Sequence, residues 1–291
     1  MTRSQRLLAS FVINLLLVIG LLIAGKSAHS TGLVADAGHN LTDAMAIMFA
    51  LVASLLAARP ATERKSFGYH RATILAAFAN GLVLIAVTVT IVWLAISRLI
   101  HPQAVHGLTV TIAASLSLLA NVFVVFLLRE GSGDLGIRSA LVHSLGDALS
   151  AGVVAIAGVV TLVTTGPIAM RIDPIASLIV AGFIVFEAFK ITGTSVQVLL
   201  EGVPSDIDLE SVRRCLCSIA GVASVHDLHV WSLSAEQRAL SVHLVIESDP
   251  LLSETAGLIT GVRTTLTKEF SISHATIEIE AQRCGSDLEH P

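Results

Sequence analysis

Six apolar runs occupy the first two thirds of the sequence, and each is long enough to cross a membrane. They lie near residues 7–27, 32–58, 72–99, 108–129, 136–165 and 173–200. An α-helix needs roughly 20 apolar residues to span the hydrocarbon core of a bilayer. The runs lack the period-2 alternation of barrel strands, so each is expected to satisfy its backbone hydrogen bonds internally as a helix. The sequence therefore predicts an α-helical membrane protein with six transmembrane helices.

The composition supports a membrane location and excludes one class of partner. Hydrophobic residues make up 54% of the 291 residues and charged residues only 14%, which is more apolar than one soluble core of this size requires. The formal net charge is −4, and the sequence has no basic stripe of the kind that neutralises phosphates. Nucleic acid is therefore not an expected partner, whereas a lipid bilayer is.

The charged residues of the loops predict the orientation of the helices. Most arginines and lysines of the first 200 residues, including the cluster in residues 59–71, fall on the side of the membrane that holds the N-terminus. By the positive-inside rule, both termini are expected in the cytosol. A short N-terminus without a transit signal favours a bacterial inner membrane as the location.

The pattern changes after the sixth run. Charged residues become frequent from Glu201 onward, and the order of expected elements is a helix, two strands, a helix and a strand, near residues 206–219, 222–232, 238–247, 252–270 and 274–281. We expect residues 1–203 to form a six-helix transmembrane domain. Residues 204–291 are expected to form a small α+β cytosolic domain of αββαβ order, which dimerisation or metal binding would stabilise because its own core is small.

Two identical motifs place ionisable side chains inside the predicted helices. His39 and Asp43 in the second run, and His143 and Asp147 in the fifth, both read H-x-x-x-D. A spacing of four puts both side chains on one face of a helix. An Asp at the centre of a membrane helix costs about 2.5–3.5 kcal/mol on insertion scales, so such groups normally face one another or a cavity. If the two helices face each other, two imidazoles and two carboxylates form a ligand set that suits tetrahedral Zn²⁺ and balances its charge.

The alternative interpretation of these motifs is polar contact between helices, which Ser, Asn and His often provide in membranes. Repetition of the same motif in two separate helices favours metal binding. Asp36, one turn before His39, and Asn40 are candidates for residues that hold the ligands in place through hydrogen bonds. Asp36 would equally serve to cap or anchor its helix near the outer surface.

Four stretches resemble those of a known family. They read L-V-A-D-A-G-H-N-L-T-D at 33–43, S-F-G-Y-H-R-A at 66–72, H-S-L-G-D at 143–147 and S-V-H-D-L-H-V-W-S-L at 224–233. In the order and spacing of these four stretches, the chain resembles the cation diffusion facilitators of the zinc-exporting, CzcD-like branch. The resemblance implies a homodimer with six helices per subunit, a cytosolic αββαβ domain, and metal–proton antiport by alternating access.

The resemblance also implies that the two H-x-x-x-D motifs form the transport site, and that His at the first position favours zinc. Cd²⁺, Co²⁺ and Ni²⁺ are further candidates, since imidazole and carboxylate accept them all. An imidazole offers a lone pair to a metal only when the ring is neutral, so protons and metal compete for the same site. An inward proton gradient would then drive metal outward.

The resemblance assigns a second set of zinc ligands, in the cytosolic domain, to His226, His243 and Glu280. It places a further ligand near residues 274–278, for which His274 and Glu278 are candidates. The even positions of the last strand share one face, which puts both glutamates on the same side. His274 would equally be an ordinary exposed residue, so the number of metals in this domain stays open at this point.

Arg71 and Glu201 match the positions of a charge pair that links the third and sixth helices at the dimer interface of relatives. The alternative is two independent side chains that reach toward the membrane surface.

Two other functions would use the same residues. An intramembrane metalloprotease would hold catalytic zinc with His and Asp, but the sequence has no H-E-x-x-H motif, and four protein ligands would leave no open position for water. A membrane metal sensor or scaffold would bind metal without transporting it. The sequence favours a transporter, which is not an enzyme.

Overall fold

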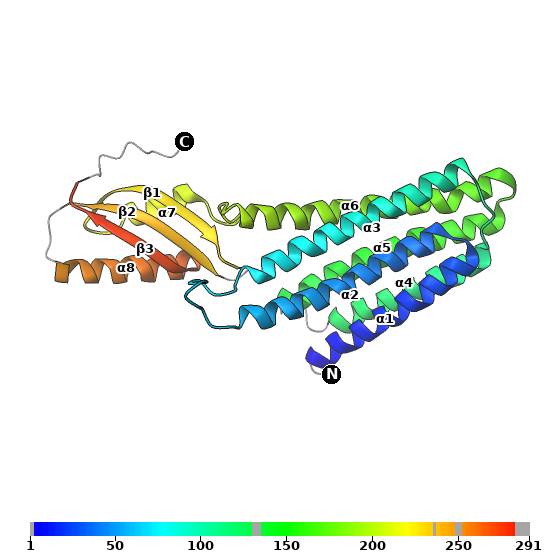
Figure 1. The fold of residues 1–291 in the computed structure, drawn as a ribbon, viewed down its shortest axis with the longest axis horizontal. Coiled ribbons are helices and arrows are strands. Elements are labelled where there is room, and N and C mark those ends of the chain that lie inside the picture. Colours follow the sequence, from blue (N-terminus) through cyan, green and yellow to red (C-terminus); the bar gives the residue numbers. More distant parts are fainter. Residues whose placement is uncertain (1–2, 130–134, 235–236, 248–251, 283–291) are drawn as a thin grey trace. The chain divides into compact units, whose positions relative to one another are not determined.

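The structure is a computed structural model that describes residues 3–129, 135–234, 237–247 and 252–282 (Figure 1). Within this part of the chain six long helices precede the strands: α1 (Arg3–Ala28), α2 (Thr31–Ala57), α3 (Ala72–Ile100), α4 (Gly107–Arg129), α5 (Leu135–Val163) and α6 (Ala169–Leu199). Five of them, α2 to α6, contain stretches long and apolar enough to cross a membrane, and Val12–Ala28 within α1 is a shorter apolar stretch. The predicted helical membrane architecture is confirmed.

By its internal contacts the chain divides into two compact units, which we describe separately. The first consists of Met1–Leu51 with Ala79–Thr192, and the second of Val52–Phe78 with Gly193–Pro291. This division does not follow the domain boundary expected at residues 203 and 204, because the segments of α2, α3 and α6 nearest the C-terminal part are grouped with it. The expected boundary therefore stays a prediction.

The core of the first unit includes many small residues, and many large apolar side chains lie on its outer surface. Its core includes Ala35 and Ala37 of α2 and Ala188 of α6, all fully buried. Large side chains such as Leu149 and Phe186 are instead 69% and 74% exposed. Small residues let membrane helices approach closely, and apolar side chains on the outer surface match lipid chains. The unit is therefore built for a bilayer.

The turn between α1 and α2 is held by a carboxylate from α6. His29 adopts a left-handed conformation with φ 55°, which ends α1. The Thr31 amide and hydroxyl each donate a hydrogen bond of 2.7 Å to Asp173, and the Ser30 hydroxyl donates another. Asp173 is only 2% exposed. A carboxylate at this place satisfies amide groups that a helix start leaves unpaired, and it interacts favourably with the positive end of the helix dipole.

The second unit contains a three-stranded sheet of β1 (Val222–Ser232), β2 (Arg238–Ile246) and β3 (Ile272–Glu280), with helices α7 (Leu209–Cys217) and α8 (Leu252–Phe270). The strand order is β1-β2-β3; β1 and β2 are antiparallel, and β2 and β3 are parallel. Leu240, Val242 and Leu244 of β2 join apolar residues of both helices in one core. Both helices therefore cover the same face of the sheet, and the predicted αββαβ order is confirmed.

Candidate metal site

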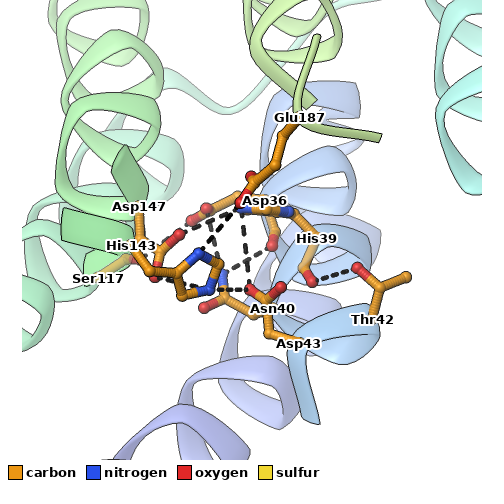
Figure 2. Close-up of polar contacts among 9 residues, drawn as sticks. All are labelled: Asp36, His39, Asn40, Thr42, Asp43, Ser117, His143, Asp147 and Glu187. Atoms are coloured by element: carbon orange, nitrogen blue, oxygen red, sulfur yellow. Dashed lines mark hydrogen bonds and ion pairs between the residues drawn. The ribbon is translucent and has the colours of Figure 1, made fainter. Parts of the chain in front are cut away.

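The two H-x-x-x-D motifs lie on α2 and α5 and face each other within the first unit (Figure 2). His39 Nε2 lies 3.1 Å from Asp147 Oδ1 and 3.8 Å from Asp43 Oδ2. His143 Nε2 lies 3.3 Å from Asp43 Oδ2 and 3.8 Å from Asp147 Oδ2. Each histidine therefore contacts both carboxylates, so that imidazoles and carboxylates alternate around a closed ring of four groups. We refer to these four residues as the transmembrane cluster.

The dimensions of the transmembrane cluster suit a small divalent cation. With metal–ligand bonds of about 2.0 Å, neighbouring ligand atoms of a tetrahedral zinc site lie about 3.3 Å apart. The four nitrogen–oxygen contacts measure 3.1–3.8 Å. The ligand atoms of His39, Asp43 and Asp147 all lie within 4.8 Å of one another, and His143 approaches this group through the two carboxylates. The cluster thus has a compact group of three with His143 at its edge.

Burial and unused hydrogen-bonding capacity also favour a cation. Asp43 Oδ2 and Asp147 Oδ2 are buried and have no hydrogen-bond partner among the described residues. A buried carboxylate oxygen without a donor is costly unless another positive group satisfies it. A divalent cation between the two carboxylates would satisfy both oxygens and balance both charges.

Asp36 connects α2 to α4 beside the transmembrane cluster, and Asn40 bonds to Asp36 within α2. Asp36 Oδ2 accepts a hydrogen bond of 3.0 Å from the Ser117 hydroxyl on α4. The Asn40 amide donates to the Asp36 backbone oxygen at 2.8 Å and to Asp36 Oδ1 at 3.3 Å. Both residues are fully buried. These contacts fix the helix turn that carries His39.

Glu187 on α6 also reaches the transmembrane cluster, which the sequence interpretation missed. Its Oε1 lies 3.4 Å from Nδ1 of His143, and Figure 2 shows the side chain pointing into the site. The signal that would have found it is the cost of an isolated carboxylate in the middle of an apolar run. The same signal marks Asp173, the residue that holds the start of α2.

In the second unit, a second group of candidate ligands lies on the sheet face opposite the helices. Strand register places His226 of β1 beside His243 of β2, and His243 beside Glu278 of β3. Glu280 Oε2 lies 2.8 Å from His226 Nε2, and Glu280 Oε1 lies 2.9 Å from His243 Nδ1. Ligand atoms of His226, His243 and Glu280 all lie within 4.8 Å of one another. The chemistry and spacing of these donors fit a zinc ion, and we refer to the three residues as the cytosolic cluster.

Two acidic residues approach His243 from its other side. Glu278 Oε2 lies 3.4 Å from His243 Nε2, and Asp227 Oδ2 lies 3.5 Å from the same nitrogen. Asp227, which the sequence interpretation did not name, has φ 49° at a register shift in β1. This irregularity lets adjacent residues of one strand reach the same neighbour. Glu278 therefore lies beside the cytosolic cluster.

His274 contacts an aromatic ring and not the cytosolic cluster. Its ring stacks edge-on against Phe67, with centroids 5.4 Å apart. The predicted charge pair is also present as a contact, since Arg71 donates a hydrogen bond of 2.7 Å to Glu201. Glu201 follows α6 with φ 60°. Both contacts lie within the second unit.

A bundle of apolar helices with a cation-sized ring of histidines and aspartates at its interior fits the class of membrane proteins that bind or carry metal cations. Two family profiles match: "Cation efflux transmembrane domain" over residues 7–200 and "Cation efflux protein, cytoplasmic domain" over residues 204–282. The chain belongs to the cation diffusion facilitator family of cation efflux proteins, and to its zinc-exporting branch.

Curated relatives match over nearly their full lengths. "Zinc transporter ZitB" of Pectobacterium atrosepticum is 37% identical, covering 98% of this chain and 88% of the relative. "Cadmium, cobalt and zinc/H(+)-K(+) antiporter" of Bacillus subtilis is 33% identical, covering 97% and 90%. "Metal cation efflux system protein CzcD" of Cupriavidus metallidurans is 33% identical, covering 92% and 83%. These are transporters and not enzymes, which confirms that expectation and leaves the metalloprotease without support.

Proposed function

We propose that the chain exports Zn²⁺ from the cytosol in exchange for protons, with the transmembrane cluster as the transport site. The observation that carries this proposal is the closed ring of two imidazoles and two carboxylates, with contacts of 3.1–3.8 Å. Nitrogen and oxygen ligands in this arrangement suit Zn²⁺ and also accept Cd²⁺, Co²⁺ and Ni²⁺. The names of the relatives include zinc, cadmium and cobalt, which supports these three metals; Ni²⁺ rests on the ligand chemistry alone.

Proton exchange follows from the ligand chemistry. A ring nitrogen that binds metal cannot also hold a proton. A free imidazole has a pKa near 6.5, so a cellular pH gradient changes its protonation. When the site faces the cytosol, protons leave and metal binds; when it faces a more acidic compartment, His39 or His143 takes up a proton and the metal is expelled. The word antiporter in the name of a relative supports this exchange.

The remaining features of the proposal concern the second domain and the orientation. We place the domain boundary after residue 203, where the composition changes. The loop charges favour both termini in the cytosol, and the bacterial relatives support a bacterial inner membrane. The cytosolic cluster would hold a regulatory zinc ion, which His226, His243 and Glu280 suit by their spacing. The protein would act as a homodimer, with the Arg71–Glu201 pair near the dimer contact.

The test is zinc flux in proteoliposomes whose inside and outside pH are set separately. The wild type is expected to move zinc when a proton gradient is imposed, and Asp147→Ala is expected to abolish flux while leaving the protein folded. Glu63→Ala, which removes an exposed carboxylate from the loop between α2 and α3, is the matched control and should keep normal flux. Robust flux in Asp147→Ala would remove the transmembrane cluster from the proposal. Zinc binding without flux in the wild type would instead favour a membrane metal sensor.

A further inference from the structure

The two histidines of the transmembrane cluster differ at the nitrogen that faces away from the carboxylates. Nδ1 of His143 lies 3.4 Å from Oε1 of Glu187. Nδ1 of His39 is buried and has no hydrogen-bond partner among the described residues. The two motifs have the same sequence spacing, yet only the α5 histidine has a carboxylate on its outer side (Figure 2). Two apparently equivalent ligands are therefore held in different ways.

A neutral imidazole carries one N–H group and one lone pair, and its hydrogen-bond partner decides which nitrogen has which. A carboxylate accepts hydrogen bonds and cannot donate when ionised. Glu187 beside Nδ1 of His143 therefore favours the form with the proton on Nδ1. That form leaves the lone pair on Nε2, which lies 3.3 Å from Asp43 Oδ2 and 3.8 Å from Asp147 Oδ2.

A carboxylate that accepts from the outer nitrogen also fixes the orientation of a metal-binding imidazole ring. Such partners typically change metal affinity or activity by about 10–100-fold when they are removed. His143 needs this support more than His39, because its side chain is 34% exposed whereas that of His39 is 5% exposed. Burial restricts the orientation of the His39 ring. The His143 ring is less buried, and the contact with Glu187 restricts its orientation instead.

We propose that Glu187 is a positioning residue of the transport site, which accepts the Nδ1–H of His143 and holds Nε2 toward the metal. This inference rests on the proposed function. Glu187 is not itself a ligand in this arrangement, since its Oε1 contacts the ring nitrogen opposite the one that faces the two aspartates. The 3.4 Å separation is longer than a typical N–H···O bond. The contact therefore guides the ring without locking it.

The test compares Glu187→Ala with Glu187→Gln, because a glutamine carbonyl still accepts the Nδ1–H but carries no charge. Glu187→Ala is expected to raise the zinc concentration for half-maximal flux by about 10–100-fold with little change in the maximal rate. Glu187→Gln should restore the half-maximal concentration to within about threefold of the wild type. Phe189→Ala, which removes a side chain that is 65% exposed on the same helix, controls for general disturbance of α6.

A double variant separates positioning from other roles. Zinc affinity is measured on detergent-purified protein by competition with a fluorescent chelator, so variants that cannot transport still give a result. All of these variants also carry His226→Ala/His243→Ala, which removes the cytosolic cluster. If Glu187 acts through His143, then Glu187→Ala should weaken zinc binding in the presence of His143 and have no further effect in a His143→Ala background.

Three outcomes would overturn the inference. Equal losses in Glu187→Gln and Glu187→Ala would mean that the charge itself binds the metal. Unchanged half-saturation in Glu187→Ala would mean that the contact has no role, and an additive effect in the His143→Ala background would mean that Glu187 acts elsewhere. Normal flux and normal affinity in His143→Ala would contradict the proposed transport site itself, whereas loss in that variant with no effect of Glu187→Ala contradicts only this inference.

Discussion

The four residues of the transmembrane cluster differ in the exposure of their side chains. Asp147 is 2% exposed and His39 5%, whereas Asp43 is 15% and His143 34% exposed. One histidine and one aspartate therefore form the enclosed half of the cluster, and the other two form its accessible half. A hydrated cation that meets the accessible pair first can exchange its water molecules for protein ligands one at a time, which avoids a large desolvation cost in a single step.

The enclosed half is where we expect selectivity between metals to be set. Replacing His39 by Asp exchanges a borderline nitrogen ligand for a hard oxygen ligand and adds a third carboxylate to the cluster. We expect the preference for zinc over Mn²⁺ to fall by about tenfold. The measurement is competition by Mn²⁺ for zinc flux in proteoliposomes. His101→Asp makes the same exchange at an exposed position and should leave competition unchanged. An unaltered preference in His39→Asp would place selectivity at other residues.

Among single residues of the membrane helices, the sequence predicted the candidate ligands that belong to a repeated motif and missed two carboxylates that do not. His39 and Asp43 were recognisable because the same spacing recurs at His143 and Asp147, and two coincidences in apolar runs need a common cause. Glu187 and Asp173 are each a single carboxylate without a motif. Their position in an apolar run marks them as costly isolated carboxylates. Their partners lie 44 and 142 residues away in sequence, so only the three-dimensional structure identifies what they contact.

At the level of elements, the sequence pattern located most helices and strands to within a few residues. The differences lie at helix ends. The helix expected at residues 206–219 is shorter, because α7 begins only after Asp208 and ends at Cys217. The sixth apolar run was placed at residues 173–200. In the structure α6 begins at Ala169 with Pro174 inside it. A proline near the first turns removes few backbone hydrogen bonds and is tolerated there.

The start of α7 should depend on pH through Asp208. The Ser211 hydroxyl, which donates to the Asp208 carboxylate, is the main cause that lowers the pKa of this carboxyl below its ordinary value of 3.8. A lowered folded-state pKa stabilises the fold above 3.8 and loses that contribution as pH falls through the folded value. We expect Asp208→Ala to reduce hydrogen-exchange protection of the first turn of α7 at pH 7, with the difference from wild type shrinking progressively as the pH falls below 3.8. A difference that stays constant as the pH falls would contradict this.

The start of α2 should depend on Asp173. The Thr31 amide and hydroxyl and the Ser30 hydroxyl converge on this buried carboxylate, and removing it leaves buried donors unsatisfied. We expect Asp173→Ala to destabilise the solubilised protein by about 3 kcal/mol, read as a lower midpoint in thermal unfolding. Ser177→Ala, which removes one hydroxyl bonded to Thr31, should cost about 1 kcal/mol. Equal midpoints for the wild type and Asp173→Ala would show that the contact contributes nothing to stability.

At the scale of the whole molecule, the described residues include two separate groups of candidate metal ligands with different surroundings. In the transmembrane cluster His39 and Asp147 are buried, and in the cytosolic cluster only Glu280 is buried. The change in composition near Glu201 predicted two domains. It did not predict that the C-terminal ends of α2 and α6 and the N-terminal end of α3 belong to the second compact unit. Hydropathy identifies residues that suit a lipid environment, whereas the division into units depends on contacts between residues.

We expect the cytosolic cluster to set the zinc concentration that activates flux, and the transmembrane cluster to set its dependence on the pH gradient. In proteoliposomes, His226→Ala/His243→Ala is expected to raise the zinc concentration that activates flux, because a regulatory ion stabilises one conformation of the carrier. The dependence of the rate on the imposed pH gradient should stay that of the wild type. His143→Ala should instead abolish or uncouple flux. Loss of pH dependence in the cytosolic double variant, together with normal coupling in His143→Ala, would show that the transmembrane histidines do not carry the protons.

The contact between Asp173 and the start of α2 holds that end of the helix in place, so that a tilt of α2 would move its other residues around this point. His39 lies eight residues beyond Thr31, which corresponds to about 12 Å along the helix axis. A tilt of about 10° around the fixed end moves a point at that distance by about 2 Å, which is the length of a zinc–nitrogen bond. Asp43, one turn further along, moves by about 3 Å. If the transmembrane cluster binds the transported metal as proposed, a small rotation of α2 around this end would change the distances between the ligands by about one metal–ligand bond length, without a large rearrangement of the bundle.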